Sequence, residues 1–189
     1  MLRNLILKNR SYRRFNPDFK LLPEQIEKWI DLARLTASGR NMQPLKYAIV
    51  TEPELCESIF PFLGWAGYLS DWKGPAEHER PVAYVMVLKD KTISDNHYCD
   101  DGIAMQSILL AAVEDGCGGC IIGSVNKSKV ARLLELPSHL ELLWAIALGK
   151  PAEEVVIDTA GDDIKYWRDE KDIHHVPKRA LTEVLVLKK

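Results

Sequence analysis

The sequence lacks the features that mark secreted, membrane-spanning and nucleic-acid-binding proteins. It contains four cysteines in 189 residues, too few for a disulfide framework, which favours a reducing compartment. It has no stretch of about 18 apolar residues and no signal-peptide pattern at its N-terminus. The formal net charge is −2, so there is no basic surplus to attract nucleic acid or an acidic membrane. We therefore expect a cytoplasmic protein without nucleic-acid or membrane partners.

The composition is that of an ordinary globular protein. Hydrophobic residues make up 47% and charged residues 28% of the chain, which are typical fractions for a packed domain. No internal repeat, low-complexity segment or linker interrupts the sequence. We therefore predict one domain that spans residues 1–189.

The segment from Asp100 to Ser124 is the one around which the rest of the chain is expected to pack. Two aspartates open it, and the apolar residues that follow lie on every side of a helical projection, a pattern typical of a buried helix. These apolar residues are Ile103, Ala104, Ile108, Leu109, Ala111, Ala112 and Val113. Asp100 and Asp101 suit the positive N-terminal end of such a helix. A strand-like, glycine-rich stretch follows, so we predict a core helix that delivers a loop to a binding site.

Further helices and strands are predicted from hydrophobic periodicity and from proline at the first helical position. The predicted helices are 3–8, one that begins at Pro23, 53–60 and 127–135. The predicted buried strands are 47–50, 82–88 and 140–148.

Three segments have less regular patterns. Residues 64–80 contain several aromatic residues without a period, so they form either a pocket wall or a packed surface loop. Residues 158–163 are predicted to be a polar connection. A β-type run at 183–187 must add to a sheet edge, either its own or that of a partner chain.

Two polar loops are candidates for ligand binding. The loop at 10–15 has three arginines and a serine, which is either a solvated basic turn or an anion site, because guanidinium groups match phosphate oxygens. The loop at 40–44 carries Asn41 and Gln43, whose amides either cap the loop or read a heteroaromatic edge that mixes carbonyl and N–H groups.

Several other motifs do not complete a known site. Cys117 and Cys120 form a C-x-x-C pattern, but no second pair offers the four ligands of structural zinc. The pattern also follows a helix instead of starting one, as a redox motif would, so we interpret both cysteines as structural. The dinucleotide fingerprint lacks its third glycine, because that position is Ile121. We interpret His174 and His175 as structural or exposed.

Four segments, taken in their order along the sequence, resemble the FMN-dependent nitroreductase family along nearly the whole chain. They are Arg10-Ser11-Tyr12-Arg13-Arg14-Phe15, Ser38-Gly39-Arg40-Asn41-Met42-Gln43-Pro44, Asp101 to Gln106 with Gly119 to Gly123, and Gly149-Lys150-Pro151 with Pro177-Lys178-Arg179. Each segment is weak alone, and their order and spacing make the resemblance specific. Leu45 departs from the tryptophan that the family often has after Q-P.

The resemblance implies an FMN cofactor held by matching residues of this chain. Arg10, Ser11 and Arg13 match the positions that bind the phosphate and adjoining ring atoms, and Lys178 and Arg179 match a late basic pair that completes that site.

Two further matches concern the flavin ring. Asn41 and Gln43 match amides that bind polar atoms of the isoalloxazine or ribityl groups, while Gly123 and Ser124 match a loop whose backbone N–H groups approach flavin N5. Glycine permits such a close backbone approach, and no side chain is implied as a catalytic acid or base.

The resemblance also implies a fold, an assembly and an activity. The fold would be α+β, a three-layer α/β/α sandwich, in an intertwined homodimer whose last strand joins the partner's sheet. NAD(P)H would pass a hydride to flavin N5, and a nitroaromatic, a quinone or a related acceptor would be reduced in a second, ping-pong half-reaction. Two alternatives remain: a flavin-binding protein without efficient turnover, and a flavin enzyme of other chemistry such as a dehydrogenase or dehalogenase.

Overall fold

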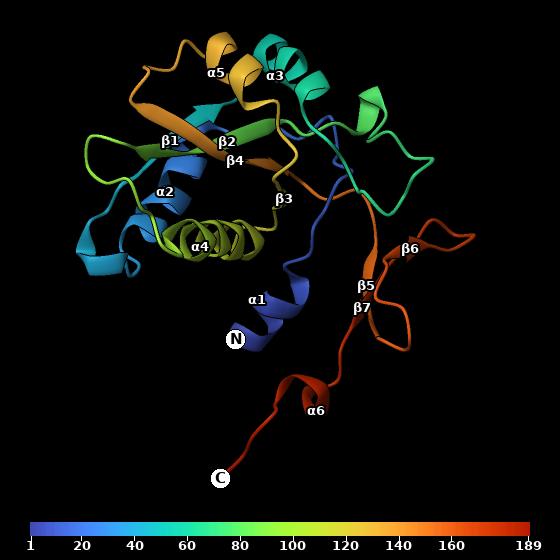
Figure 1. Cartoon of the computed structure of the whole chain (residues 1–189). Helices are drawn as coiled ribbons and strands as arrows, with labels where there is room; N and C mark the ends of the chain where they lie inside the picture. The colour runs from blue at the N-terminus through green and yellow to red at the C-terminus, as the bar shows by residue number, and fades with distance from the viewer.

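The computed structural model describes residues 1–189 and has a central antiparallel sheet between two layers of helices (Figure 1). Helices α2 and α4 pack on one face of the sheet, and α3 and α5 pack on the other. The predicted three-layer α/β/α architecture is therefore confirmed. No helix has both the length and the apolar character that crossing a membrane requires.

The main sheet has the order β1-β2-β4-β3, and every pair of neighbours in it is antiparallel. Its strands are β1 (Leu45–Val50), β2 (Ala83–Asp90), β3 (Gly118–Ile122) and β4 (Leu140–Gly149). All eight residues of β2 are buried. Successive side chains of a strand point to opposite faces, so Val85 packs under α2 and α4 while Met86 packs under α3 and α5. The continuous apolar run that predicted a buried strand at 82–88 thus corresponds to β2, which is buried on both faces.

The predicted helices are present, with ends close to those expected. They are α1 (Leu2–Lys8), α2 (Pro23–Arg34), α3 (Pro53–Ile59), α4 (Asp100–Glu114) and α5 (Lys127–Leu133), followed by the short α6 (Leu181–Val184). Single 3-10 turns form at Gly39–Asn41, Phe60–Phe62 and Glu77–Glu79. Pro23 occupies the first turn of α2, and Ile26, Trp29 and Ala33 form its buried stripe.

Helix α4 is the core helix that the sequence predicts, although one side of it is incompletely covered. Ala104, Ile108 and Ala112 are almost fully buried against the sheet and α2. Ile103 and Val113 are only half-buried in the single chain. An apolar side that remains accessible is consistent with a further contact on that side.

A second sheet, which the sequence analysis did not predict, lies beside the main sandwich (Figure 1). It pairs β5 (Val155–Thr159) in parallel with β7 (His174–Lys178), and β7 with the two-residue strand β6 (Trp167–Arg168). The expected polar connection at 158–163 therefore begins inside a strand, because β5 runs to Thr159. The short strands of this second sheet carry histidine, aspartate and proline, so they lack the apolar alternation on which a strand prediction depends.

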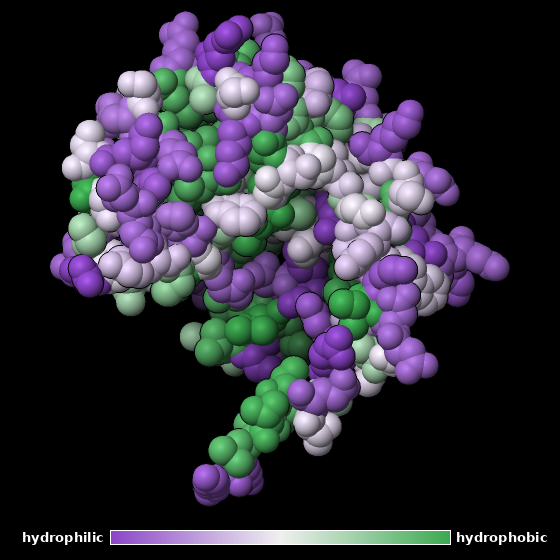
Figure 2. Space-filling view, viewed as in Figure 1, coloured by the Kyte–Doolittle hydropathy of each residue, from purple (hydrophilic) through white to green (hydrophobic).

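The β-type run at 183–187 does not add to a sheet edge of its own chain, so that alternative is wrong. Leu181–Val184 form α6, and residues 185–189 form no strand. The apolar side chains of this segment project from the molecule, with Val186 91% exposed (Figure 2). A terminal strand needs a sheet edge to join, and residues 185–189 pair with none of the strands of the single chain. Exchange of this segment between subunits stays a prediction.

Cys117 and Cys120 are buried and free, and they belong to core clusters on opposite faces of the main sheet. Burial raises the pKa of both thiols, which makes them poor nucleophiles and poor metal ligands. No group of three or more His, Cys, Asp or Glu side chains is arranged to hold a metal ion. The arrangement agrees with a packing role for both cysteines.

Candidate functional site

The basic loop at 9–15 is tied to the edge of the main sheet. Ser11 forms a parallel bridge with Gly119 of β3, and the Tyr12 N–H donates to the Gly119 carbonyl at 3.0 Å. Phe15 is fully buried and bridges Pro151 at the end of β4. These contacts fix the direction in which the arginines leave the loop.

A buried carboxylate, that of Glu153, holds the same loop from the other side. It accepts the backbone N–H groups of Arg13 and Arg14, the latter at 3.1 Å. Its second oxygen accepts from the Arg168 guanidinium at 2.9 Å, and its side chain is only 2% exposed. Sequence reasoning missed Glu153, because the adjacent Glu153 and Glu154 after β4 match no motif and nothing in the sequence shows that Glu153 is buried.

Four of the residues predicted to bind a cofactor phosphate meet at one cavity of 280 Å³. It is lined by Asn9, Arg10, Ser11, Arg13, Tyr166, His174, Val176 and Lys178. Arg10 donates to the Ile6 carbonyl at 2.8 Å, while its buried Nε has no hydrogen-bond partner. Burial lowers the pKa of Arg10, and the guanidinium remains charged because its ordinary value is so high. We call this cavity the basic pocket.

His174 forms a neutral wall of the basic pocket. Its Nε2 lies 3.4 Å from Nη1 of Arg13, and a guanidinium only donates, so Nε2 accepts and the proton belongs on Nδ1. Burial, together with the charges of Arg13 and Arg168, lowers the pKa of His174 to about 4. The guanidinium carbon of Arg13 also lies 5.1 Å from the Tyr166 ring centroid. The positive charge of the pocket therefore comes from its arginines and Lys178.

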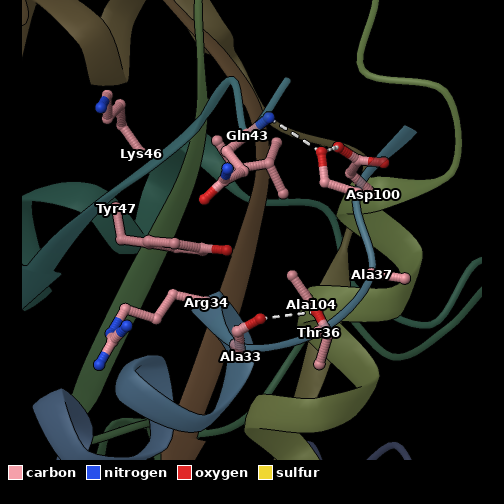
Figure 3. A pocket seen from close by; sticks show the side chains of 11 residues that line it. Ala33, Arg34, Thr36, Ala37, Gln43, Lys46, Tyr47, Asp100 and Ala104 are labelled. Atoms are coloured by element: carbon pink, nitrogen blue, oxygen red, sulfur yellow. Dashed lines mark hydrogen bonds between the residues drawn. The ribbon is translucent and has the colours of Figure 1, made fainter. Parts of the chain in front are cut away.

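Asn41 and Gln43 lie elsewhere, in a loop beside the N-terminus of α4. The Gln43 side-chain N–H donates to the Asn41 side-chain oxygen at 3.2 Å, so the two predicted amides contact each other. Gln43, Tyr47 and Asp100 line a second cavity, of 200 Å³, between α2, β1 and α4 (Figure 3). Burial, with a smaller contribution from Asp100, raises the pKa of Tyr47 to about 12, which keeps its hydroxyl neutral.

Gly123 and Ser124 lie at a third position, directly after β3. The Ser124 carbonyl accepts the Gly64 N–H at 2.7 Å, so part of the 64–80 loop borders this turn. A Cβ on Gly123 would lie 2.5 Å from the Trp144 ring, and that ring donates its N–H to Asp101 at 2.6 Å. Glycine is therefore required here by close packing, and the turn is connected through Trp144 to the start of α4.

The single chain brings eight of the nine predicted cofactor residues into three groups instead of one. Arg10, Ser11, Arg13 and Lys178 share the basic pocket, Asn41 and Gln43 share their loop, and Gly123 and Ser124 share theirs. Arg179 joins none of them, because its guanidinium donates to Glu183 at 3.3 Å.

Sequence comparison identifies relatives of known name. A family model described as "Nitroreductase family" matches residues 6–150. The chain is 27% identical over 175 residues to Protein DrgA of Synechocystis, covering 79% of this chain and 83% of DrgA. It is 29% identical over 160 residues to the oxygen-insensitive NADPH nitroreductase of Salmonella typhimurium, covering 79% of this chain and 65%, less than two thirds, of that protein.

Structural comparison gives the same fold. A nitroreductase family protein from Streptococcus pneumoniae superimposes with a TM-score of 0.68 at 17% identity, covering 100% of both chains. The family model spans most of the sequence and includes the basic loop, the amide loop, α4 and β3. The chain belongs to the nitroreductase family.

Proposed function

We propose that this protein is an FMN-dependent NAD(P)H oxidoreductase that reduces nitroaromatic, quinone or related acceptors. The observation that carries the proposal is the basic pocket, which gathers Arg10, Ser11, Arg13 and Lys178 from segments far apart in the sequence. Family membership and the activities named for the relatives support the same assignment.

The residues of the basic pocket fit the phosphate of FMN. The buried Arg10 Nε and the buried His174 Nδ1 have no partners within the protein, and burying unsatisfied donors is costly. A phosphate would accept hydrogen bonds from guanidinium, ammonium and hydroxyl donors together. Glu153 keeps the loop in place by accepting its backbone N–H groups and pairs with Arg168, so its carboxylate does not neutralise the arginine side chains of the basic pocket.

The remaining predicted residues would hold the ring end of the cofactor. Asn41 and Gln43 present amide donors and acceptors, and the turn at Gly123 presents backbone without a side chain. When bound, FMN would supply the hydride chemistry, accepting from NAD(P)H and delivering to the acceptor. The protein's part is to bind, orient and exclude water.

The separation of these groups within one chain supports a homodimer in which two copies complete each site. Helix α4 has an incompletely covered apolar side, and the C-terminal segment exposes Leu181, Val184 and Val186. Contiguous exposed apolar surface of this kind marks interaction sites. Exchange of the 182–189 segment would cover it.

Two measurements test the proposed function. The purified protein should be yellow or take up added FMN, and NADH or NADPH should bleach the flavin absorbance without oxygen. Binding of FMN without bleaching would favour the alternative of a flavin-binding protein without turnover. A colourless protein that does not bind added FMN would refute the proposal.

A matched pair of variants tests the basic pocket. Arg10→Ala should weaken FMN binding by about 1.5–3 kcal/mol, the contribution of a charge-assisted hydrogen bond. Arg132→Ala removes an exposed arginine of α5 that does not line the basic pocket, and it should leave the affinity unchanged. Equal FMN affinity in both variants would remove Arg10 from the site.

A further inference from the structure

Asp100 is a buried carboxylate that serves a loop far from it in the sequence. It stands in the first turn of α4 and is 4% exposed. One of its oxygens accepts the Ser38 hydroxyl at 2.6 Å, and the other accepts the Gly39 N–H at 2.8 Å. The positive end of the helix favours negative charge at this position. Both oxygens are therefore used by the 38–43 loop.

A second link extends this anchor to the other end of the loop. The backbone N–H of Gln43 donates to Ser38 Oγ at 2.9 Å, so the serine hydroxyl joins Asp100 to Gln43 (Figure 3). A hydroxyl can donate one hydrogen bond and accept others, and here it does both. The loop is closed by a relay from Asp100 through Ser38 to Gln43.

The loop held by this relay has an unfavourable backbone. Arg40, Asn41 and Gln43 have φ angles of 53°, 56° and 52°, in the left-handed region that residues with a Cβ rarely adopt. Gly39 leaves no room for a side chain either, because a Cβ there would lie 2.4 Å from the Tyr98 ring. Such conformations persist only where surrounding contacts enforce them. The Asp100 relay supplies those contacts at both ends of the strained stretch.

We propose that Asp100 is the positioning residue of the 38–43 loop: its hydrogen bonds to Ser38 and Gly39 hold Asn41 and Gln43 in the conformation that binds the flavin ring. This inference rests on the proposed function. Asp100 is 4% exposed and its two hydrogen bonds go to the loop, so the role assigned to it is to position Asn41 and Gln43. The neighbouring Asp101 does not share this role, because it accepts from Trp144.

Asp115 provides a control for a purely structural role. It lies at the opposite end of α4 and accepts the Trp29 N–H at 2.7 Å. Asp115→Asn therefore changes an aspartate that, like Asp100, accepts a hydrogen bond from a distant segment. The helix between the two aspartates is about 20 Å long, which keeps the control away from the loop.

The test compares Asp100→Asn, Ser38→Ala and Asp115→Asn in the full chain. FMN affinity is measured by fluorescence titration, together with the absorption spectrum and reduction potential of bound FMN. Hydrogen exchange at residues 39–43 is measured without FMN. We expect Asp100→Asn to weaken FMN binding by about tenfold, with a shifted spectrum and faster loop exchange. Ser38→Ala should do the same to a smaller extent, and Asp115→Asn should change thermal stability alone.

The outcomes separate this inference from the proposed function. If the Asp100 and Ser38 variants keep the affinity, spectrum and loop exchange of the wild type, the positioning role is refuted. If Asp100→Asn does not fold, Ser38→Ala alone decides, because it leaves the Asp100–Gly39 bond intact. A wild-type protein that fails to bind FMN refutes the proposed function. Independently of FMN, unchanged hydrogen exchange at residues 39–43 in the variants refutes the proposal that Asp100 holds the loop.

Discussion

Acidification should destabilise this protein through His174. The pKa of His174 is lowered from 6.5 to about 4 in the folded chain, first by burial and then by the charges of Arg13 and Arg168. In the unfolded chain the imidazole titrates normally, so between these two values the unfolded state binds more protons. The free energy of unfolding must therefore fall as the pH falls through this window.

The size of the effect follows from the shift. Each pKa unit corresponds to about 1.4 kcal/mol, so lowering the pH from about 7 to about 5 should remove about 2 kcal/mol of stability through this residue. His174 is 1% exposed, so solvent screening reduces the value little. The neighbouring His175 has the opposite sign: its hydrogen bond to Asp158, at 2.8 Å, raises its pKa, so its stabilising contribution is complete in acid and is lost as the pH rises through the raised value.

The assay is urea denaturation at several pH values for three proteins. His174→Gln keeps an acceptor for Arg13 and removes the titration, so its stability should depend less on pH than that of the wild type between about pH 7 and pH 5. His175→Gln should depend on pH more steeply than the wild type in the same range. Parallel curves for the wild type and His174→Gln would refute the assignment of a neutral, buried His174.

Three further predictions follow from the packing. Gly123→Ala should cost about 1–3 kcal/mol of unfolding free energy by overpacking against Trp144, and thermal melts should show the loss; an unchanged melting temperature would contradict the close approach. Asp101→Asn should alter the fluorescence of Trp144, whose ring N–H it accepts, and a spectrum identical to that of the wild type would argue against this hydrogen bond. Deleting residues 182–189 should convert a dimer into a monomer in light-scattering measurements, and an intact dimer would count against strand exchange.

The main sandwich could be predicted from the sequence because its elements carry strong local signals. Pro23 with the stripe of α2, the apolar run of β2 and the all-round apolar helix α4 each predict their own structure. The basic pocket was predicted in part, because clustered arginines resemble a family motif. These signals depend on residue type and spacing alone.

The other features of the fold and of the candidate site depend on tertiary contacts, which local sequence patterns do not indicate. Glu153 and Asp100 each stand next to another acidic residue, and their importance comes from burial and from partners far away along the chain. The small second sheet forms from short polar strands, and its residues Tyr166 and His174 enter the basic pocket only after that sheet has formed. The 183–187 run has strand-forming residues, but a strand also needs an edge to join.

The contact between Arg13 and Glu153 has a consequence for the order of folding. It joins residues 140 positions apart in the sequence, and the basic pocket also needs Lys178 from the end of β7. A ribosome extends a chain at about 5–20 residues per second, so the N-terminal arginines emerge long before their partners. Contacts of such long range form slowly. The basic pocket can therefore assemble only after Lys178 has been synthesised, and a nascent chain could bind an anion there only from that point on.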